Sequence, residues 1–126
     1  MKNLFVISFL PLLINCTPII KSAETTSTTS TEILKQKLKE NPFLVDVRTP
    51  QEFAEGSAKG AVNIPLEEIP KRISEFEGKK NIITFCVTGK RSTKAISILN
   101  ENGIKDVTNG IGLENVKKLQ DKKFKF

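Results

Sequence analysis

An apolar run near the middle of the chain ends in a cysteine and leads directly into a helix pattern. The run extends from Ile82 to Phe85 and is followed by the loop Cys86-Val87-Thr88-Gly89-Lys90-Arg91-Ser92. Apolar residues then recur at helical spacing, with Ala95 and Leu99 on one face. A short buried strand joined to a helix by a tight loop is typical of parallel α/β sheets. The sequence therefore predicts a thiol at the carboxyl end of a strand, which is where ligands bind in such sheets.

The rest of the globular part alternates in the same way between strand and helix signals. Thr29 and Glu32 have capping-box spacing, and the helix that they open stops at Asn41-Pro42. Thr49 is predicted to cap a second helix, with Pro50 at its first position. The other predicted elements are strands at 43–47, 61–64, 81–85 and 104–108, a helix opened by Pro70, and a last helix after the turn Asn109-Gly110. This alternation predicts an α/β fold with a mainly parallel central sheet and helices on both faces.

Composition limits the chemistry that the chain can perform. Its 126 residues are enough for one domain. Histidine is absent, which excludes Ser-His-Asp and Cys-His catalysis and removes the commonest zinc ligand. We expect neither a metal nor a cofactor. The net charge of +6 comes with lysines spread along the chain, without a basic stripe or interleaved aromatic residues. Nucleic-acid binding is therefore not expected.

The first fifteen residues have the pattern of an export signal. Lys2 precedes an apolar stretch from Leu4 to Ile14 that is too short to span a bilayer. The stretch Leu13-Ile14-Asn15-Cys16 resembles the lipobox of bacterial lipoproteins, in which the cysteine is lipidated and becomes the new N-terminus. We predict a lipoprotein-type signal peptide at residues 1–15 and a membrane anchor on Cys16. The protein is then expected in the periplasm or cell envelope.

A segment rich in serine and threonine follows the predicted signal. It has almost no apolar residue after Ile20, so it cannot bury enough surface to offset the entropy of ordering it. We predict a flexible tether at residues 16–30 and a folded domain at residues 31–122.

Cys86 is the one cysteine left for the domain if Cys16 carries a lipid. An internal disulfide is then excluded. A lone cysteine is commonly a small buried apolar residue. The place of Cys86 before a loop with a glycine and two cations favours a reactive thiol instead.

Three blocks of sequence resemble the single-domain rhodanese family, over roughly residues 30–119. They are Asp46-Val47-Arg48-Thr49-Pro50-Gln51-Glu52-Phe53, Gly60-Ala61-Val62-Asn63-Ile64-Pro65 and the loop Cys86 to Ser92. Their order and spacing together make the resemblance specific. The chain departs from the family pattern in Ser57-Ala58, where a His-Ile pair is common, and in the absence of tryptophan from residues 109–113.

The resemblance implies sulfur transfer through Cys86. Its thiolate would attack the outer sulfur of thiosulfate or a similar anionic donor, release sulfite, and hold a persulfide until an acceptor such as cyanide removes it. The loop suits this chemistry, because its backbone N–H groups and the dipole of the following helix favour an anion. We expect Lys90 and Arg91 to lower the pKa of the thiol further, Arg91 to orient the donor, and Gly89 to permit the turn. The predicted site is Cys86 with a cradle of Val87, Thr88, Gly89, Lys90, Arg91 and Ser92.

Three charged residues of the first block are predicted to support the site. We expect Arg48 to pair with Glu52 one helical turn further on, and Asp46 to bond nearby backbone or loop groups. We expect the domain to act as a monomer.

Alternative functions use the same loop differently. Cysteine phosphatases and some arsenate reductases have a related cysteine-to-arginine cradle, but with one residue more than the four between Cys86 and Arg91. They also usually have a histidine before the cysteine, where Phe85 stands here. A non-catalytic binding module of this fold is disfavoured because Cys86 and Arg91 are retained. A persulfide carrier that delivers sulfur to a protein partner remains open, as does the identity of the acceptor.

Overall fold

A computed structural model of the chain describes residue 11 and residues 26–122. The predicted signal peptide, Cys16 and the first part of the predicted tether lie outside the described residues, apart from residue 11. Within the described part, no helix is both long enough and apolar enough to cross a membrane.

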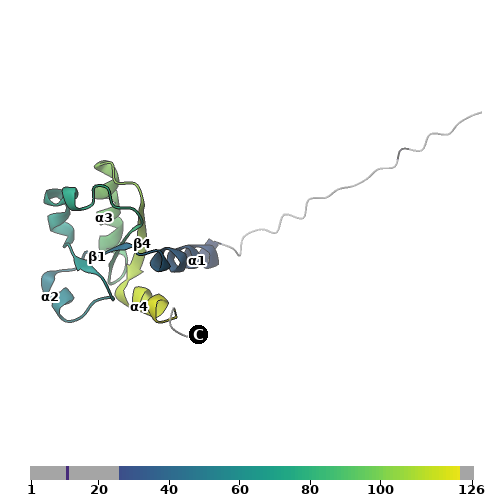
Figure 1. Cartoon of the computed structure of the whole chain (residues 1–126), viewed down its shortest axis with the longest axis horizontal. Helices are drawn as coiled ribbons and strands as arrows, with labels where there is room; N and C mark the ends of the chain where they lie inside the picture. The colour runs from purple at the N-terminus through teal and green to yellow at the C-terminus, as the bar shows by residue number, and fades with distance from the viewer. Residues whose placement is uncertain (1–10, 12–25, 123–126) are drawn as a thin grey trace, which may run out of the picture.

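Within residues 26–122, four parallel strands form the central sheet. They are β1 (Phe43–Asp46), β2 (Val62–Asn63), β3 (Ile82–Cys86) and β4 (Val107–Gly112), in the order β2-β1-β3-β4. Figure 1 shows where β1 and β4 lie in the sheet. All five residues of β3 are buried, as expected for a central strand covered on both faces. The predicted parallel α/β sheet is confirmed. Because the strands run in one direction, Asp46 and Cys86 lie at the same end of the sheet, where both strands have their carboxyl ends.

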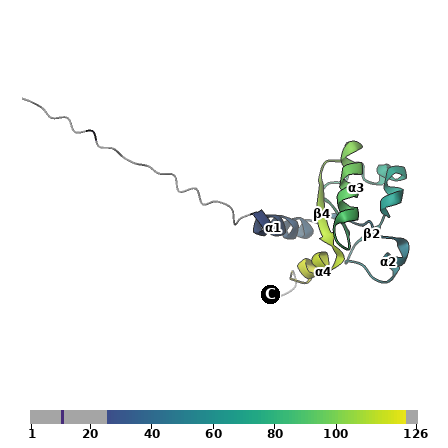
Figure 2. The same cartoon turned by 180° about the vertical axis from the view of Figure 1, so that it is seen from behind.

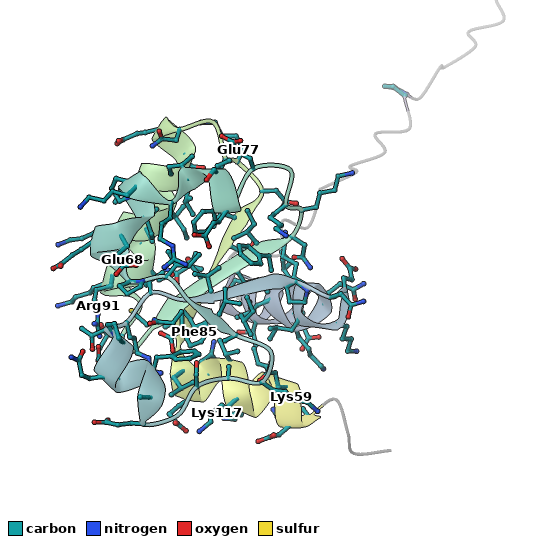
Figure 3. The ribbon with its side chains drawn as sticks, turned by 60° about the vertical axis from the view of Figure 1, so that its left-hand side comes forward. Lys59, Glu68, Glu77, Phe85, Arg91 and Lys117 are labelled. Atoms are coloured by element: carbon teal, nitrogen blue, oxygen red, sulfur yellow. The ribbon has the colours of Figure 1, made fainter. Side chains whose placement is uncertain are left out.

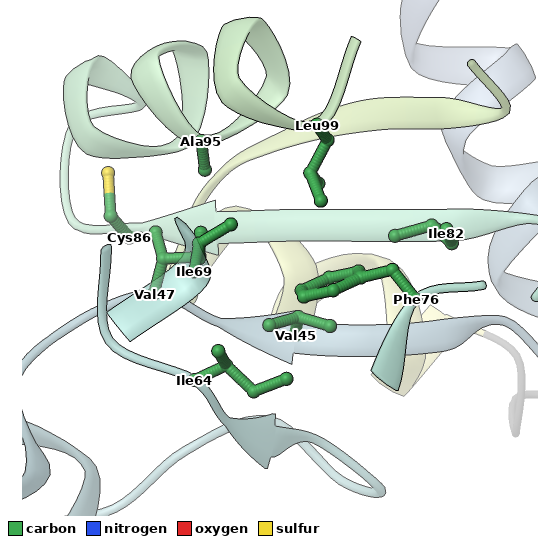
Figure 4. Close-up of a cluster of buried hydrophobic side chains, with 9 residues drawn as sticks. All are labelled: Val45, Val47, Ile64, Ile69, Phe76, Ile82, Cys86, Ala95 and Leu99. Atoms are coloured by element: carbon green, nitrogen blue, oxygen red, sulfur yellow. The ribbon is translucent and has the colours of Figure 1, made fainter. Parts of the chain in front are cut away.

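Helices cover both faces of the sheet, as Figures 1 and 2 show. The helices are α1 (Thr26–Lys39), α2 (Pro50–Ala54), α3 (Lys90–Glu101) and α4 (Leu113–Asp121), and two short 3-10 helices are η1 (Leu66–Lys71) and η2 (Ile73–Glu75). Alternate residues of β3 point to opposite faces. Ile82 and Cys86 pack with α3 and the 3-10 segment (Figure 4), whereas Ile83 and Phe85 pack with α1 and α4.

The N-terminal helix starts earlier than predicted. It begins at Thr26, so Thr29 is not its N-cap, and residues 26–30 of the predicted tether are helical. The capping-box spacing predicted Thr29 as the N-cap, and this prediction was wrong, since Thr29 lies inside the helix. The second helix follows its signal: Thr49 is the N-cap, Glu52 completes the capping box, and Pro50 is the first residue.

Two further elements differ from the prediction. Pro70 does not open an α-helix but lies inside η1. The expected helix is replaced by short turns in which the N–H of residue i+3 donates to the carbonyl oxygen of residue i. The helix was predicted to carry Ile73 and Phe76, and both still contact the core: Phe76 is fully buried, and Ile73 is partly buried against the same cluster. The predicted strand at 104–108 is displaced to β4, and Asn109-Gly110 lies within it rather than in a turn. Gly110 is there for close packing, since an added Cβ would lie 3.1–3.2 Å from Ile83, Val116 and Phe85.

Candidate active site

The loop after β3 wraps its backbone around the sulfur of Cys86. Gly89 has φ +91°, a left-handed conformation that side chains disfavour, and immediately precedes α3. This turn brings the Gly89 N–H to within 3.0 Å of the Cys86 Sγ, to which it donates. Figure 4 shows Cys86 at the end of its strand, facing the first turn of α3. The side chain is 1% exposed, so the sulfur lies at the bottom of the loop.

Backbone dipoles lower the pKa of the Cys86 thiol. Burial is the largest single influence and raises the pKa, because it disfavours the thiolate. Four backbone N–H groups act in the opposite direction and together outweigh it, so the pKa lies below the ordinary value; they belong to Ser92, Gly89, Arg91 and Thr88. The loop therefore stabilises a thiolate without an imidazole base.

The side chains of the predicted cradle have different surroundings from one another. The Ser92 hydroxyl is buried and donates to the Thr84 carbonyl at 2.8 Å, with the Thr84 hydroxyl 2.7 Å away, so Ser92 faces β3. The side chains of Val87, Thr88 and Lys90 are exposed. The cradle is thus built from main-chain groups.

The four charged residues near the loop pair differently from the prediction. Arg48 does not pair with Glu52; it binds Asp46, with Nη2 2.6 Å from Oδ2 and Nε 2.9 Å from Oδ1. Asp46 also accepts from the Arg48 N–H and the Ser57 hydroxyl, which agrees with the expected bonds to backbone and loop groups. The expected pairing failed because Glu52 turns back to cap its own helix and binds Arg91 instead.

Glu52 and Arg91 form a two-pronged ion pair between α2 and α3. Arg91 Nη1 lies 2.7 Å from Glu52 Oε2, and Nη2 lies 2.9 Å from Oε1. The bonds from Arg91, followed by those from Thr49, lower the pKa of Glu52 to about 2. Because the pKa is depressed in the folded state, the pair is intact above the usual value of 4.5 and is lost only as the pH falls toward 2. Arg91 is therefore held by a carboxylate at neutral pH.

Strand β4 supports the loop from behind, which the sequence interpretation missed. Ile111 has φ +70°, a strained conformation for a β-branched residue, and its carbonyl oxygen accepts from the Cys86 thiol at 3.7 Å. Asn109 holds this bend, because its Oδ1 accepts from the Ile111 N–H and its Nδ2 donates to Thr93 of α3. The one sequence signal for this region was its departure from the family pattern at residues 109–113.

Gly112 is expected to be essential to the shape of the loop. A Cβ added at Gly112 would collide with the Val87 carbonyl oxygen and lie 3.1 Å from its carbon. Gly112→Ala should therefore displace the loop and lower the turnover of the sulfur transfer that the resemblance implies by about tenfold or more. It should also lower the free energy of unfolding by roughly 1–3 kcal/mol. Gly110→Ala is the matched control, since its Cβ would meet core side chains rather than the loop. Urea unfolding and steady-state kinetics on both variants check this, and a Gly112→Ala protein with normal turnover would contradict it.

The Cys86 thiol is expected to react at lower pH than an ordinary cysteine. The backbone N–H groups around Sγ lower its pKa, so the thiolate fraction at neutral pH is raised. The rate of alkylation by iodoacetamide, followed on the peptide that contains Cys86, should rise with a midpoint below the usual ~8.5. Unfolding in urea hydrates these N–H groups and should return the midpoint to the ordinary value. Equal midpoints in the two states would contradict the role of the loop.

Known proteins that are similar to this chain include rhodanese-like domains and sulfurtransferases. Residues 30–113 match the rhodanese-like domain family. A sulfurtransferase from Allochromatium vinosum is 38% identical over 80 residues, which cover 62% of this chain and 75% of that protein. The thiosulfate sulfurtransferase PspE of Escherichia coli is 36% identical over 74 residues, which cover 57% of this chain and 71% of that protein.

Solved structures show the same fold. A rhodanese from E. coli, determined with anions, superposes with a TM-score of 0.55 at 32% identity, covering 60% of this chain and 91% of that one. A rhodanese-like domain protein from Staphylococcus aureus superposes with a TM-score of 0.54 at 38% identity, covering 69% and 86%. With a thiol at the end of a central parallel strand and a match over most of its folded part, this chain belongs to the rhodanese-like domain family.

Proposed function

We propose that the protein is a thiosulfate sulfurtransferase that carries sulfur on Cys86. The observation that carries the proposal is the loop itself: four backbone N–H groups stabilise the thiolate of a buried cysteine in a domain without histidine. Relatives named as sulfurtransferases and thiosulfate sulfurtransferases support the same reaction.

The reaction has two displacement steps. The Cys86 thiolate attacks the outer sulfur of thiosulfate, the S–S bond of thiosulfate breaks, and its electron pair leaves with sulfite. The persulfide on Cys86 keeps its negative charge near the backbone N–H groups that stabilised the thiolate. An acceptor such as cyanide then attacks the outer sulfur, and the Cys86 thiolate is restored as thiocyanate forms.

Intact-mass measurement on the purified protein tests this proposal. Exposure to thiosulfate should add the mass of one sulfur atom, and cyanide should remove it as thiocyanate forms. A protein that gains no sulfur and makes no thiocyanate would overturn the proposal. Hydrolysis of phosphate esters in its place would favour the cysteine phosphatase alternative.

We propose in addition that the protein is exported and attached to a membrane through Cys16. The support is the signal pattern of residues 1–15 and the lipobox-like Leu13-Ile14-Asn15-Cys16. The cysteine stands ten residues before the start of α1, so a lipid there would hold the domain close to the membrane surface. Cys16→Ala should move the protein from the membrane fraction to the soluble fraction, with a corresponding loss of acyl mass. Unchanged partitioning would overturn the anchor.

A further inference from the structure

The guanidinium of Arg91 is paired with a carboxylate that is itself held in place. Two nitrogens of Arg91 bind the two oxygens of Glu52 at 2.7 and 2.9 Å. Glu52 Oε2 also accepts from the Thr49 N–H at 2.9 Å and the Thr49 hydroxyl at 3.0 Å. Charge-assisted, two-pronged pairs of this kind are the strong ones. The charge of Arg91 is thus matched by a fixed negative charge from α2.

The charge of Arg91 also interacts with a charge on Cys86. The pKa of Arg91 is raised first by its bonds to Glu52, against the opposing effect of burial, and also by the negative charge of the Cys86 thiolate. Arg91 is therefore close enough to attract a charge on the sulfur. A carboxylate that neutralises Arg91 must weaken the attraction of the site for any further anion.

A cavity that Arg91 helps to line also disfavours anions. Its volume is about 330 Å³, and it is lined by Arg91, by apolar residues such as Val47, Pro65 and Leu66, and by Glu67 and Glu68. Figure 3 labels Arg91 and Glu68 on this side of the molecule. Apart from Arg91, the charged residues that line the cavity are carboxylates. A donor group that enters this cavity would meet apolar and acidic side chains.

We propose that Glu52 is a specificity-determining residue, which acts through Arg91 to disfavour doubly charged sulfur donors relative to singly charged donors that carry an apolar group. The inference rests on the proposed function, in which Cys86 accepts sulfane sulfur. Thiosulfate brings two negative charges to the cradle, and an aryl thiosulfonate brings one. In both cases the thiolate attacks the outer sulfur and the S–S bond breaks. The electron pair leaves with sulfite in the first case and with a sulfinate in the second.

The variant Glu52→Gln tests this with thiosulfate and benzenethiosulfonate as the two donors. Glutamine is a good residue at this capping position and keeps the size of the side chain, so the fold is retained. The KM for thiosulfate should fall about fivefold at low ionic strength, with kcat nearly unchanged, and the KM for benzenethiosulfonate should fall less. Glu75→Gln is the matched control. Glu75 also pairs with an arginine, Arg72, but it adjoins Phe43, at the opposite end of the sheet from Cys86.

A second readout does not depend on sulfur transfer. Iodoacetate carries a negative charge and iodoacetamide does not, so the ratio of their alkylation rates at Cys86 reports the potential at the sulfur. Glu52→Gln should raise this ratio about fivefold at low ionic strength, and high salt should reduce the effect. The control Glu75→Gln should leave the ratio unchanged.

The two readouts separate the two proposals. A ratio that is the same in Glu52→Gln and in the unaltered protein would overturn the role of Glu52, even if sulfur transfer is intact. A raised ratio with no sulfur transfer from either donor would support the charge effect of Glu52 and overturn the proposed reaction. A loss of stability without a change in the ratio or in KM would show that Glu52 is structural.

Discussion

Replacement of Cys86 by serine is expected to abolish sulfur transfer while leaving the domain folded. A serine hydroxyl is far less acidic than a thiol, and four backbone N–H groups that lower a thiol pKa cannot ionise it near neutral pH. The fold should survive, since serine is slightly smaller than cysteine and its oxygen can accept from the Gly89 N–H. We expect kcat/KM for thiosulfate to fall by about 10⁴-fold or more, as for other enzymes that lose a nucleophile.

Thiocyanate formation and intact mass check this expectation together. The Cys86→Ser protein should form no thiocyanate and gain no sulfur. Ser92→Ala is a suitable control, because its hydroxyl bonds Thr84 rather than facing the sulfur, and its backbone N–H is kept. That variant should lose about 1 kcal/mol of stability and keep most of its turnover. A sulfur adduct that persists in Cys86→Ser, or that maps to another residue, would show that Cys86 is not the carrier.

Local signals predicted the elements whose structure depends on neighbouring residues in the chain. The helix cap at Thr49 is one example, since Thr49 and Glu52 satisfy each other's backbone bonds whatever packs around them. The strand that ends in Cys86 is another, because a short apolar run flanked by turn residues has few alternatives. These signals were sufficient for the parallel α/β fold.

Contacts between distant segments explain the misplaced turn at residues 109–110. Asn109-Gly110 is typical of a turn, yet both residues lie in β4. A glycine suits this strand position because an added Cβ would be only 3.1–3.2 Å from the side chains of Ile83, Val116 and Phe85. No pattern within residues 104–112 reports on this packing.

In the candidate site, too, local features were predicted and contacts between distant residues were not. The loop from Cys86 to Gly89 was predicted, since a strand, a glycine turn and a helix start determine where its N–H groups point. The pairing of its charges was not. Arg48 and Glu52 have the spacing of a helical pair, but Arg48 lies before α2, so that rule does not apply to it. The bond of Glu52 to Arg91 depends on how α2 and α3 pack against each other.

Replacement of Asp46 by asparagine is expected to cause a large loss of stability. Asp46 is fully buried and Arg48 is 6% exposed. The carboxylate accepts from the Arg48 backbone and guanidinium and, at 2.7 Å, from the Ser57 hydroxyl, so it ties β1 to the segment after α2. Asparagine keeps the shape but leaves the Arg48 charge buried without a counter-charge. Such losses cost about 3–5 kcal/mol, which should be measurable as a shift of the urea midpoint.

A double variant distinguishes the cost of an unpaired charge from the value of the pair. Asp46→Asn with Arg48→Met removes both charges and should recover a substantial part of the loss, because replacing a buried pair by apolar groups is often close to neutral. Glu75→Gln breaks an exposed pair with Arg72 and should leave the urea midpoint nearly unchanged. If Asp46→Asn costs as little as Glu75→Gln, the buried pair does not hold this edge of the sheet. If the double variant is as unstable as Asp46→Asn, the loss comes from the bonds to Ser57 and the backbone rather than from the stranded guanidinium.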